Sequence, residues 1–464
     1  MIHFNNFIPK RPLAITCYVF LITFLICSCK KFIAVPAPST ELASASVFTD
    51  SLTATAAQTV IYSNMAGSTT YTIPFFTGLS ADELLNYSTN PDVAQLYSNG
   101  LSSSNGSTSG LWAQWYQYIY AANAVLEGAQ NSTSLSPSLK NELEGEAKFV
   151  RAFSHFYLVN LYGNIPLILT TDYTINKSAK QVAAAQVYQQ IIADLKDAQR
   201  LLASDFSYGG GERIRPNKWA ATALLARVYL YTKDWGNAES SAATIIADGT
   251  DFSLVNDLNQ VFLANGNEAI WQLKPSLPNE NTSEGFFFIL AGIPSTVSLT
   301  NSFVSSFEPL DQRKTDWVDT VSANGIIYYF PYKYKIKAGS TLTEYSMVLR
   351  LSEQYLIRAE AEANGAGGGT SAAINDLNVI RNRAGLPNYA GATDKASILA
   401  ALLHERQVEL FTEWGHRWLD LKRSGLTDNV LSAIKPDWKS TAALYPIPLT
   451  ELQNDPNLVQ NPGY

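Results

Sequence analysis

Cysteine is almost absent from this 464-residue chain, and the three cysteines that occur all lie within the first 29 residues: Cys17, Cys27 and Cys29. Because no thiol follows Cys29, a disulfide framework is excluded and the fold has to rest on a hydrophobic core. Hydrophobic residues make up 46% of the chain, which is enough for such a core.

Charge is also scarce. Only 16% of the residues are charged, against the usual quarter, and the formal net charge is −7. Nucleic-acid binding depends on Lys and Arg neutralising phosphates, so a polynucleotide partner is excluded. No run of 18 apolar residues follows the first 30 residues, which predicts no membrane span in the body of the chain.

Sequence motifs of enzymes are missing as well. There is no nucleophile elbow, phosphate-binding loop or dinucleotide fingerprint. Beyond the leader the only histidines are His155, His404 and His416, and none has a second histidine four residues on, which excludes the H-E-x-x-H zinc motif. His155 lies in an apolar helical pattern and is interpreted as structural. We therefore predict no catalytic residue, metal or cofactor, although a pair of carboxylates acting on glycosidic bonds stays open.

The amino-terminal residues follow the layout of an export signal. Lys10 and Arg11 precede an almost wholly apolar stretch over 13–26, and Ser28 and Cys29 follow it. This order is typical of a secretory signal peptide. An apolar residue three before a cysteine, with a small residue between, resembles the lipobox of bacterial lipoproteins. We expect a signal peptide over 1–28, lipidation of Cys29, and a lipidated tether over 29–47 that leads into one domain over 48–464.

Apolar residues recur at helical spacing over much of the chain. The pattern predicts helices over 48–64, 112–126, 139–162, 184–203 and 397–424. The acidic start of the third of these, with Glu142, Glu144 and Glu146, is interpreted as a solvated helix end. Five tryptophans on helices are predicted to be core residues: Trp112, Trp115, Trp219, Trp414 and Trp418.

Two segments carry the small residues that let antiparallel helices approach closely. Over 217–247, Leu225, Ala226, Tyr229, Ala238 and Ala242 fall at the offsets of a tetratricopeptide unit. A looser copy occupies 353–381. The sequence therefore predicts a mostly α-helical fold built from such helix pairs.

Between the helical parts lie two segments rich in Ser, Asn, Gly and aromatic residues, 66–110 and 252–348. Neither shows a convincing period, so both are predicted to be loop-rich and ligand-facing, with a small β-hairpin around 326–334. Aromatic rings in such polar segments suit the C–H faces of sugar rings. The predicted ligand-binding residues are Tyr71, Asp82, Tyr87, Tyr97, Phe287, Trp317, Tyr328 and Tyr329.

Charges of alternating sign recur at helical spacing near the carboxyl terminus, at Glu405, Arg406, Glu409, Glu413, Arg417, Asp420 and Arg423. We interpret them as an ion-pair network that ties the last helix to the body rather than as a ligand site.

Six blocks of sequence resemble the SusD/RagB family of outer-membrane lipoproteins of Bacteroidota. They occur in the following order: 29–32, 146–166, 217–221, 350–361, 405–421 and 460–464. They begin with Cys-Lys-Lys-Phe and end with Gln-Asn-Pro-Gly-Tyr, and they span nearly the whole chain after the leader.

The resemblance implies a tetratricopeptide-like helical fold, capture of an oligosaccharide at the cell surface, and delivery to a SusC-like TonB-dependent transporter, with no catalysis. The matching blocks are scaffold, so no binding residue is carried over. Capture of peptides, and a structural partner of the barrel without a ligand, remain alternatives. We predict that Tyr87→Ala or Trp317→Ala weakens glycan binding without unfolding the domain.

Overall fold

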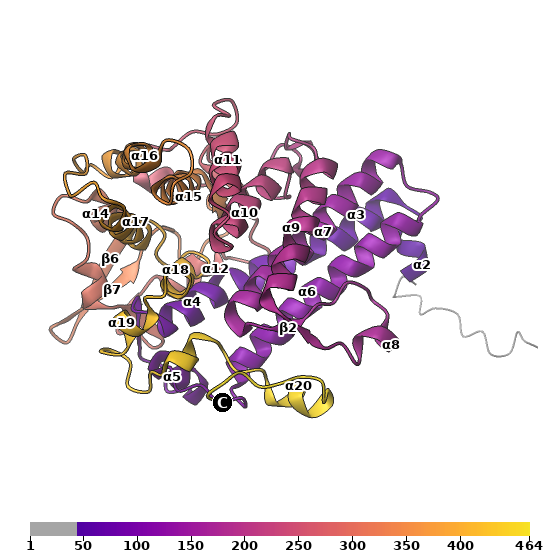
Figure 1. Ribbon diagram of the computed structural model, residues 1–464, viewed down its shortest axis with the longest axis horizontal. Helices are drawn as coiled ribbons and strands as arrows, with labels where there is room; N and C mark the ends of the chain where they lie inside the picture. Colours follow the sequence, from indigo (N-terminus) through magenta and orange to yellow (C-terminus); the bar gives the residue numbers. More distant parts are fainter. Residues whose placement is uncertain (1–43) are drawn as a thin grey trace, which may run out of the picture. The chain divides into compact units, whose positions relative to one another are not determined.

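The computed structural model describes residues 44–464, and this part of the chain is mainly helical (Figure 1). A short helix, α2 (Ser44–Val47), belongs to a first unit that ends at Val47, and residues 48–464 form a second compact unit. The predicted signal peptide and Cys29, with most of the predicted tether, lie outside the described residues. The mostly α-helical fold expected from the sequence is confirmed for the described part.

Four long helices pack one after another at the start of the second unit: α3 (Ser51–Asn64), α6 (Gly106–Asn131), α7 (Pro137–Tyr162) and α9 (Ala184–Leu201). Helices α6 and α7 extend their predicted regions, whereas α3 begins three residues later than predicted and α9 ends two residues earlier. Side chains cap the starts of α3 and α7. The Asp50 carboxylate accepts hydrogen bonds from the backbone amides of Leu52 and Thr53, and the Ser136 hydroxyl accepts one from the backbone amide of Leu139. Helix α7 is buried on nearly all sides, as its two apolar stripes predict.

The two predicted tetratricopeptide-like pairs are confirmed. The first consists of α10 (Lys218–Tyr231) and α11 (Trp235–Ile246), and the second of α15 (Leu351–Ala363) and α16 (Gly369–Arg383). Asn217 caps α10 through the amides of Trp219 and Ala220. The pairs stack because α11 packs against α15, so the chain continues the helix-on-helix layering of its first half.

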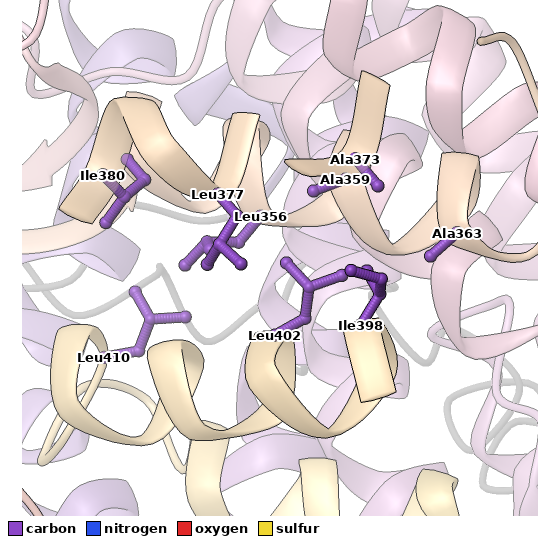
Figure 2. Packing of buried hydrophobic residues seen from close by; sticks show 9 residues of the cluster. All are labelled: Leu356, Ala359, Ala363, Ala373, Leu377, Ile380, Ile398, Leu402 and Leu410. Atoms are coloured by element: carbon purple, nitrogen blue, oxygen red, sulfur yellow. The ribbon is translucent and has the colours of Figure 1, made fainter. Parts of the chain in front are cut away.

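Helix α17 (Lys395–Glu409) closes the second pair from below, as Figure 2 shows. Nine residues from the three helices and the turn after α17 form this core: Leu356, Ala359, Ala363, Ala373, Leu377, Ile380, Ile398, Leu402 and Leu410. Alanines lie where α15 and α16 approach each other, and leucines and isoleucines fill the wider gap toward α17. Small residues thus set the spacing within the pair and large ones the spacing to the next layer.

The segment 66–110 was expected to be loop-rich, and this prediction is wrong. It contains a π-helical turn (Met65–Thr69), α4 (Thr70–Ser80), β1 (Leu84–Asn86) and α5 (Pro91–Ser98). Threonine hydroxyls on α4 donate to the carbonyl four residues back, and tertiary packing buries most of the helix. Burial overrides the low helix propensity of Thr, Ser and Gly.

The predicted last helix over 397–424 is instead two helices. Helix α17 ends at Glu409, and α18 (His416–Ser424) begins after a turn in which Thr412, Trp414 and Gly415 have positive φ. The buried Lys333 ammonium donates to the carbonyls of Glu409 and Phe411, which occupies acceptors that a continuous helix would use.

The loop-rich insert over 252–348 does contain the predicted hairpin, made of β6 (Val318–Ala323) and β7 (Ile326–Pro331). The hairpin joins a four-stranded antiparallel sheet in the order β1-β5-β7-β6, where β5 is Val297–Leu299. Two strand pairs were not predicted: β4 (Ala269–Leu273) with β8 (Ser346–Arg350), and β2 (Ile165–Pro166) with β3 (Gln181–Val182). The short helices are α8 (Tyr173–Asn176), α12 (Ser283–Phe288), α13 (Asn301–Val304), α14 (Gln312–Asp316), α19 (Thr427–Leu431) and α20 (Leu449–Asn454).

Candidate functional site

The sheet brings two predicted tyrosines together. Tyr87 directly follows β1, and its amide donates to the carbonyl of Thr296 before β5, which extends the pairing by one step. Tyr328 lies on β7, two strands away. The two rings meet edge to face, with centroids 5.7 Å apart and planes at 77°. Tyr328 is buried, whereas Tyr87 keeps part of its ring exposed.

A third predicted tyrosine, Tyr97 on α5, joins them. The Lys435 ammonium lies 4.3 Å from the centre of its ring and donates to the carbonyl of Leu79 at 2.6 Å. Burial raises the pKa of Tyr97, and the nearby Tyr87 adds to this effect. We call Tyr87, Tyr97 and Tyr328 the tyrosine surface. Helix α4 contacts both α5 and α18, close to the hairpin in Figure 1.

The predicted residue Asp82 lies five positions before Tyr87 and is held by Arg417 and Thr300. Its carboxylate forms two parallel hydrogen bonds with Arg417 on α18, Nε to Oδ1 at 2.8 Å and Nη2 to Oδ2 at 2.7 Å. Thr300 donates two hydrogen bonds to this segment. Its hydroxyl donates to the backbone carbonyl of Asp82, and its backbone amide donates to the backbone carbonyl of Glu83. Burial raises the pKa of Glu83 to about 8, and Asp82 adds to the shift. The Glu83 side chain is therefore a neutral acid at pH 7.

Two other predicted residues form a separate aromatic pair. The Tyr71 ring on α4 stacks on Phe287 of α12 with centroids 3.7 Å apart and planes at 12°. Phe286 meets Phe287 edge on, and both phenylalanines are about 40% exposed. No ring contact joins this pair to the tyrosine surface within the described residues.

The last two predicted residues lie elsewhere. Trp317 is wholly buried, its indole N–H donates to the carbonyl of Leu258 at 2.9 Å, and the Lys333 ammonium lies 4.9 Å from the ring centre. Its ring presents no face to a ligand in this structure. Tyr329 points to the opposite face of β7 from Tyr328, because side chains alternate along a strand.

The predicted ion-pair network near the carboxyl terminus is confirmed, and it is buried. Arg350 contacts Glu268 at 2.9 Å, Glu409 at 2.6 Å and Glu413 at 2.8 Å. Arg313 contacts Asp311, Glu405 and Glu409, Arg406 pairs with Asp420, and Arg423 pairs with Glu360 and Asp420. Burial alone would raise the pKa of Glu409, but its three arginine neighbours, Arg383, Arg350 and Arg313, hold it well below the usual value. These carboxylates are held in buried ion pairs that join parts of the fold.

The acidic start of α7 was interpreted as solvated, which is wrong for two of its three residues. Glu142 and Glu146 are buried. Glu146 pairs with Arg215 at 2.6 Å and accepts a hydrogen bond from the Tyr62 hydroxyl at 2.8 Å. Burial and repulsion from Glu146 raise the pKa of Glu142 to about 8. Both partners of Glu146 are distant in sequence, so helical spacing gave no sign of them.

His155 is confirmed as a structural histidine. It is fully buried, its Nδ1 lies 3.0 Å from the Arg151 carbonyl, and burial, with Arg151 adding, lowers its pKa to about 3. Four of the five predicted core tryptophans are buried (Trp112, Trp115, Trp414 and Trp418), and Trp219 is half-buried. Among residues 44–464, no three His, Cys, Asp or Glu side chains gather as metal ligands would.

Sequence reasoning missed two features near candidate surfaces. Lys435 lies in a segment without a motif, so its contact with Tyr97 could not be foreseen. A cavity of about 560 Å³ lies between α6, α8 and α20 and is walled by Trp112, Tyr116 and Tyr173, of which Tyr173 is 74% exposed. Of these three residues, Trp112 is predicted from the sequence as a core residue only. Within the described residues, no helix combines the length and apolar character needed to cross a bilayer.

Comparison with known proteins decides the family. Residues 38–230 match the model of a SusD-like family described as starch-binding and associating with the outer membrane, and residues 314–464 match the model of the SusD family. The chain belongs to the SusD/RagB family. SusD-like protein P2 of Formosa agariphila is 27% identical over 421 residues, which cover 78% of this chain and 81% of that protein.

Solved structures show that this SusD/RagB chain also has the family fold. A SusD superfamily protein from Bacteroides vulgatus superposes with a TM-score of 0.78 at 23% identity, covering 90% of this chain and 100% of that one. A laminarin-binding SusD-like protein superposes with a TM-score of 0.73 at 22% identity, and the match covers 89% of this chain and 99% of that one. At these identities the likeness concerns the fold and leaves the ligand open.

Proposed function

We propose that this protein is a cell-surface lipoprotein that captures an oligosaccharide and delivers it to a SusC-like TonB-dependent transporter. The observation that carries the proposal is the tyrosine surface, in which Tyr87 and Tyr97 remain partly exposed beside the buried Tyr328. The family models support it, since one is described as starch-binding and associating with the outer membrane. Binding without catalysis fits the carboxylates of α17 and α18, which are held by arginines.

The chemistry of the tyrosine surface suits a sugar. The two partly exposed rings, Tyr87 and Tyr97, each offer an apolar face for the C–H groups of a pyranose and a hydroxyl for its oxygens. An aromatic contact contributes on the order of 1 kcal/mol beyond its area burial, so two rings give modest and reversible affinity. Such affinity suits a protein that has to release its cargo.

The rigid support behind the rings favours recognition without reordering. Tyr87 is held by the backbone of the sheet, and Tyr97 by α5 and by Lys435. Because these groups are already ordered, little conformational entropy is lost when a ligand binds. The Tyr71–Phe287 pair is a second candidate contact for the same or a longer chain.

Binding screens test the ligand class. The mature protein is applied to arrays of plant, algal and microbial oligosaccharides and, in parallel, to an array of peptides. We expect glycan binding that Tyr87→Ala weakens and that Tyr120→Ala, a control at a 57% exposed tyrosine on α6, leaves unchanged. Binding to peptides alone would replace the proposal with peptide capture.

The anchor and the partner need separate tests. Mass spectrometry of the protein from its native membrane should find an acylated amino terminus at Cys29, and Cys29→Ala should abolish it. Affinity purification of the native complex should recover a TonB-dependent transporter in stoichiometric amount. An unacylated start, or a preparation without the transporter, would contradict the corresponding part of the proposal.

A further inference from the structure

The basic groups beside the tyrosine surface are already paired. Both donor nitrogens of Arg417 that face Asp82 are engaged by that carboxylate at 2.7 and 2.8 Å, and only 9% of the Arg417 side chain is exposed. A carboxylate bound in this two-pronged way balances the charge of the guanidinium and occupies its Nε–Nη2 edge. The guanidinium cannot turn toward a carboxylate or sulfate on a ligand without breaking its two hydrogen bonds to the half-buried Asp82.

Lys435 is engaged in a similar way. Its ammonium donates to the Leu79 carbonyl and lies over the Tyr97 ring, and the residue is only 5% exposed. Burial lowers the pKa of Lys435 to about 8, and Asp82 opposes this shift, so the ammonium is still mostly protonated at pH 7 and is held in its place by the Leu79 carbonyl.

The remaining features repel negative charge. The face of an aromatic ring carries negative potential, which attracts sugar C–H groups and disfavours a carboxylate or sulfate above it. The whole chain is acidic, with a formal net charge of −7. A net negative protein slows the approach of a polyanion. Glu83, the buried acid behind the surface, is neutral at pH 7 and supplies no charge of either sign.

We propose that the tyrosine surface selects neutral oligosaccharides and rejects those that carry uronate or sulfate groups. This inference rests on the proposed function, since it names the chemical class of the glycan bound at the same site. Recognition depends on ring faces and hydroxyls, because the two cations beside the surface in the part of the chain that the structure describes, Arg417 and Lys435, are engaged by Asp82 and by the Leu79 carbonyl.

Calorimetric titration with matched ligand pairs tests the inference. One pair is methyl-esterified against de-esterified oligogalacturonide, and the other is desulfated against sulfated carrageenan oligosaccharide. Neutral laminarin and maltose oligosaccharides complete the panel. Any ligand whose binding is lost in Tyr87→Ala should be neutral. Its Kd should change less than about twofold between 50 and 500 mM NaCl, because salt screens only charge-dependent binding.

A charge variant makes the test sharper. In Asp82→Asn, the Arg417 guanidinium loses its carboxylate partner. Loss of this contact lowers affinity for the best neutral glycan several-fold, whereas we expect affinity for the de-esterified oligogalacturonide to rise, so that the ratio of the two affinities changes about tenfold or more. Circular dichroism confirms that the variant folds, and Arg417→Gln/Asp82→Asn, which removes the cation too, should lose the gain.

The possible results distinguish the specificity for neutral glycans from glycan capture itself. A uronate or sulfated glycan that binds wild-type protein through Tyr87, and weakens more than about tenfold with added salt, overturns the neutral specificity and leaves glycan capture intact. If no glycan binds in a manner that depends on Tyr87, both the specificity and the proposed site are overturned.

Discussion

Asp82 and Arg417 are 335 positions apart in the chain, and their side chains form two parallel hydrogen bonds of 2.8 and 2.7 Å. The pair joins the turn after α4 to α18, so it fixes α18 to the segment that carries Tyr87. A lysine cannot reproduce the fork of an arginine. The integrity of the tyrosine surface should therefore depend on this contact.

Arg417→Lys tests that dependence. We expect the free energy of unfolding to fall by about 1–3 kcal/mol, since one charge-assisted hydrogen bond is lost. Glycan affinity should also fall several-fold, because β1 and Tyr87 lose part of their support. Urea denaturation and calorimetry measure the two effects, and Arg200→Lys, at an arginine whose side chain is 68% exposed, is the control. Unchanged affinity together with lower stability would show that the surface does not need this support.

Trp317 separates the scaffold from the site. The ring is wholly buried against cationic side chains, so Trp317→Ala should lower the free energy of unfolding by about 3–5 kcal/mol. Tyr87→Ala, at a partly exposed ring, should cost about 1 kcal/mol or less. Thermal and urea denaturation of the two variants side by side checks the contrast. Equal stability of both would mean that Trp317 is not the core residue the structure shows.

The buried pair between the two tetratricopeptide-like repeats makes a strong prediction. Arg227 on α10 binds Glu353 on α15 through Nε and Nη2, both at 2.7 Å. Arg227→Met leaves the Glu353 carboxylate buried without its cation, and we expect a loss of about 3–5 kcal/mol. Arg200→Met, at an exposed pair with Asp197, should change stability by less than about 1 kcal/mol. A small effect at Arg227 would contradict the burial of this pair.

Glu142 gives the protein a pH-dependent stability. Its pKa is about 8 in the folded protein and about 4.3 in an unfolded chain. The folded state therefore holds a proton that the unfolded state has released, and this group makes stability fall as pH rises from about 4.5 to 8.

Glu142→Gln removes that proton. The variant should match the wild type near pH 4.5 and be more stable by about 1–3 kcal/mol at pH 8.5. Denaturation at a series of pH values measures the difference, and Glu144→Gln on the same turn is the control. A difference that shrinks as pH rises would show that the sign is wrong.

The helix pairs could be predicted from sequence because their signals are local. Alanines at fixed offsets around Tyr229, and again around Ala359, allow close helix approach wherever they occur. The long apolar periods of α6 and α7 are local in the same way. The predicted hairpin follows from a short run of β-forming residues with a tight turn at Asn324 and Gly325.

What could not be predicted depends on distant partners. The helix α4 is rich in Thr and is stabilised by burial, and the break after Glu409 follows from the ammonium of Lys333, 76 positions away. Glu146 meets Arg215 and Tyr62, neither of which is close in sequence. The tyrosines of the candidate site were found one by one from their polar surroundings. Their grouping, and the exclusion of Trp317 from it, required the three-dimensional structure.

The most direct test of the account is a calorimetric titration of the mature protein with the neutral oligosaccharide that binds best on the array, repeated with Tyr87→Ala and Tyr120→Ala. We predict that the Tyr87 variant weakens binding at least tenfold, by about 1.4 kcal/mol, while the Tyr120 variant binds like the wild type. Equal affinity of all three proteins would contradict the claim that the tyrosine surface holds the glycan.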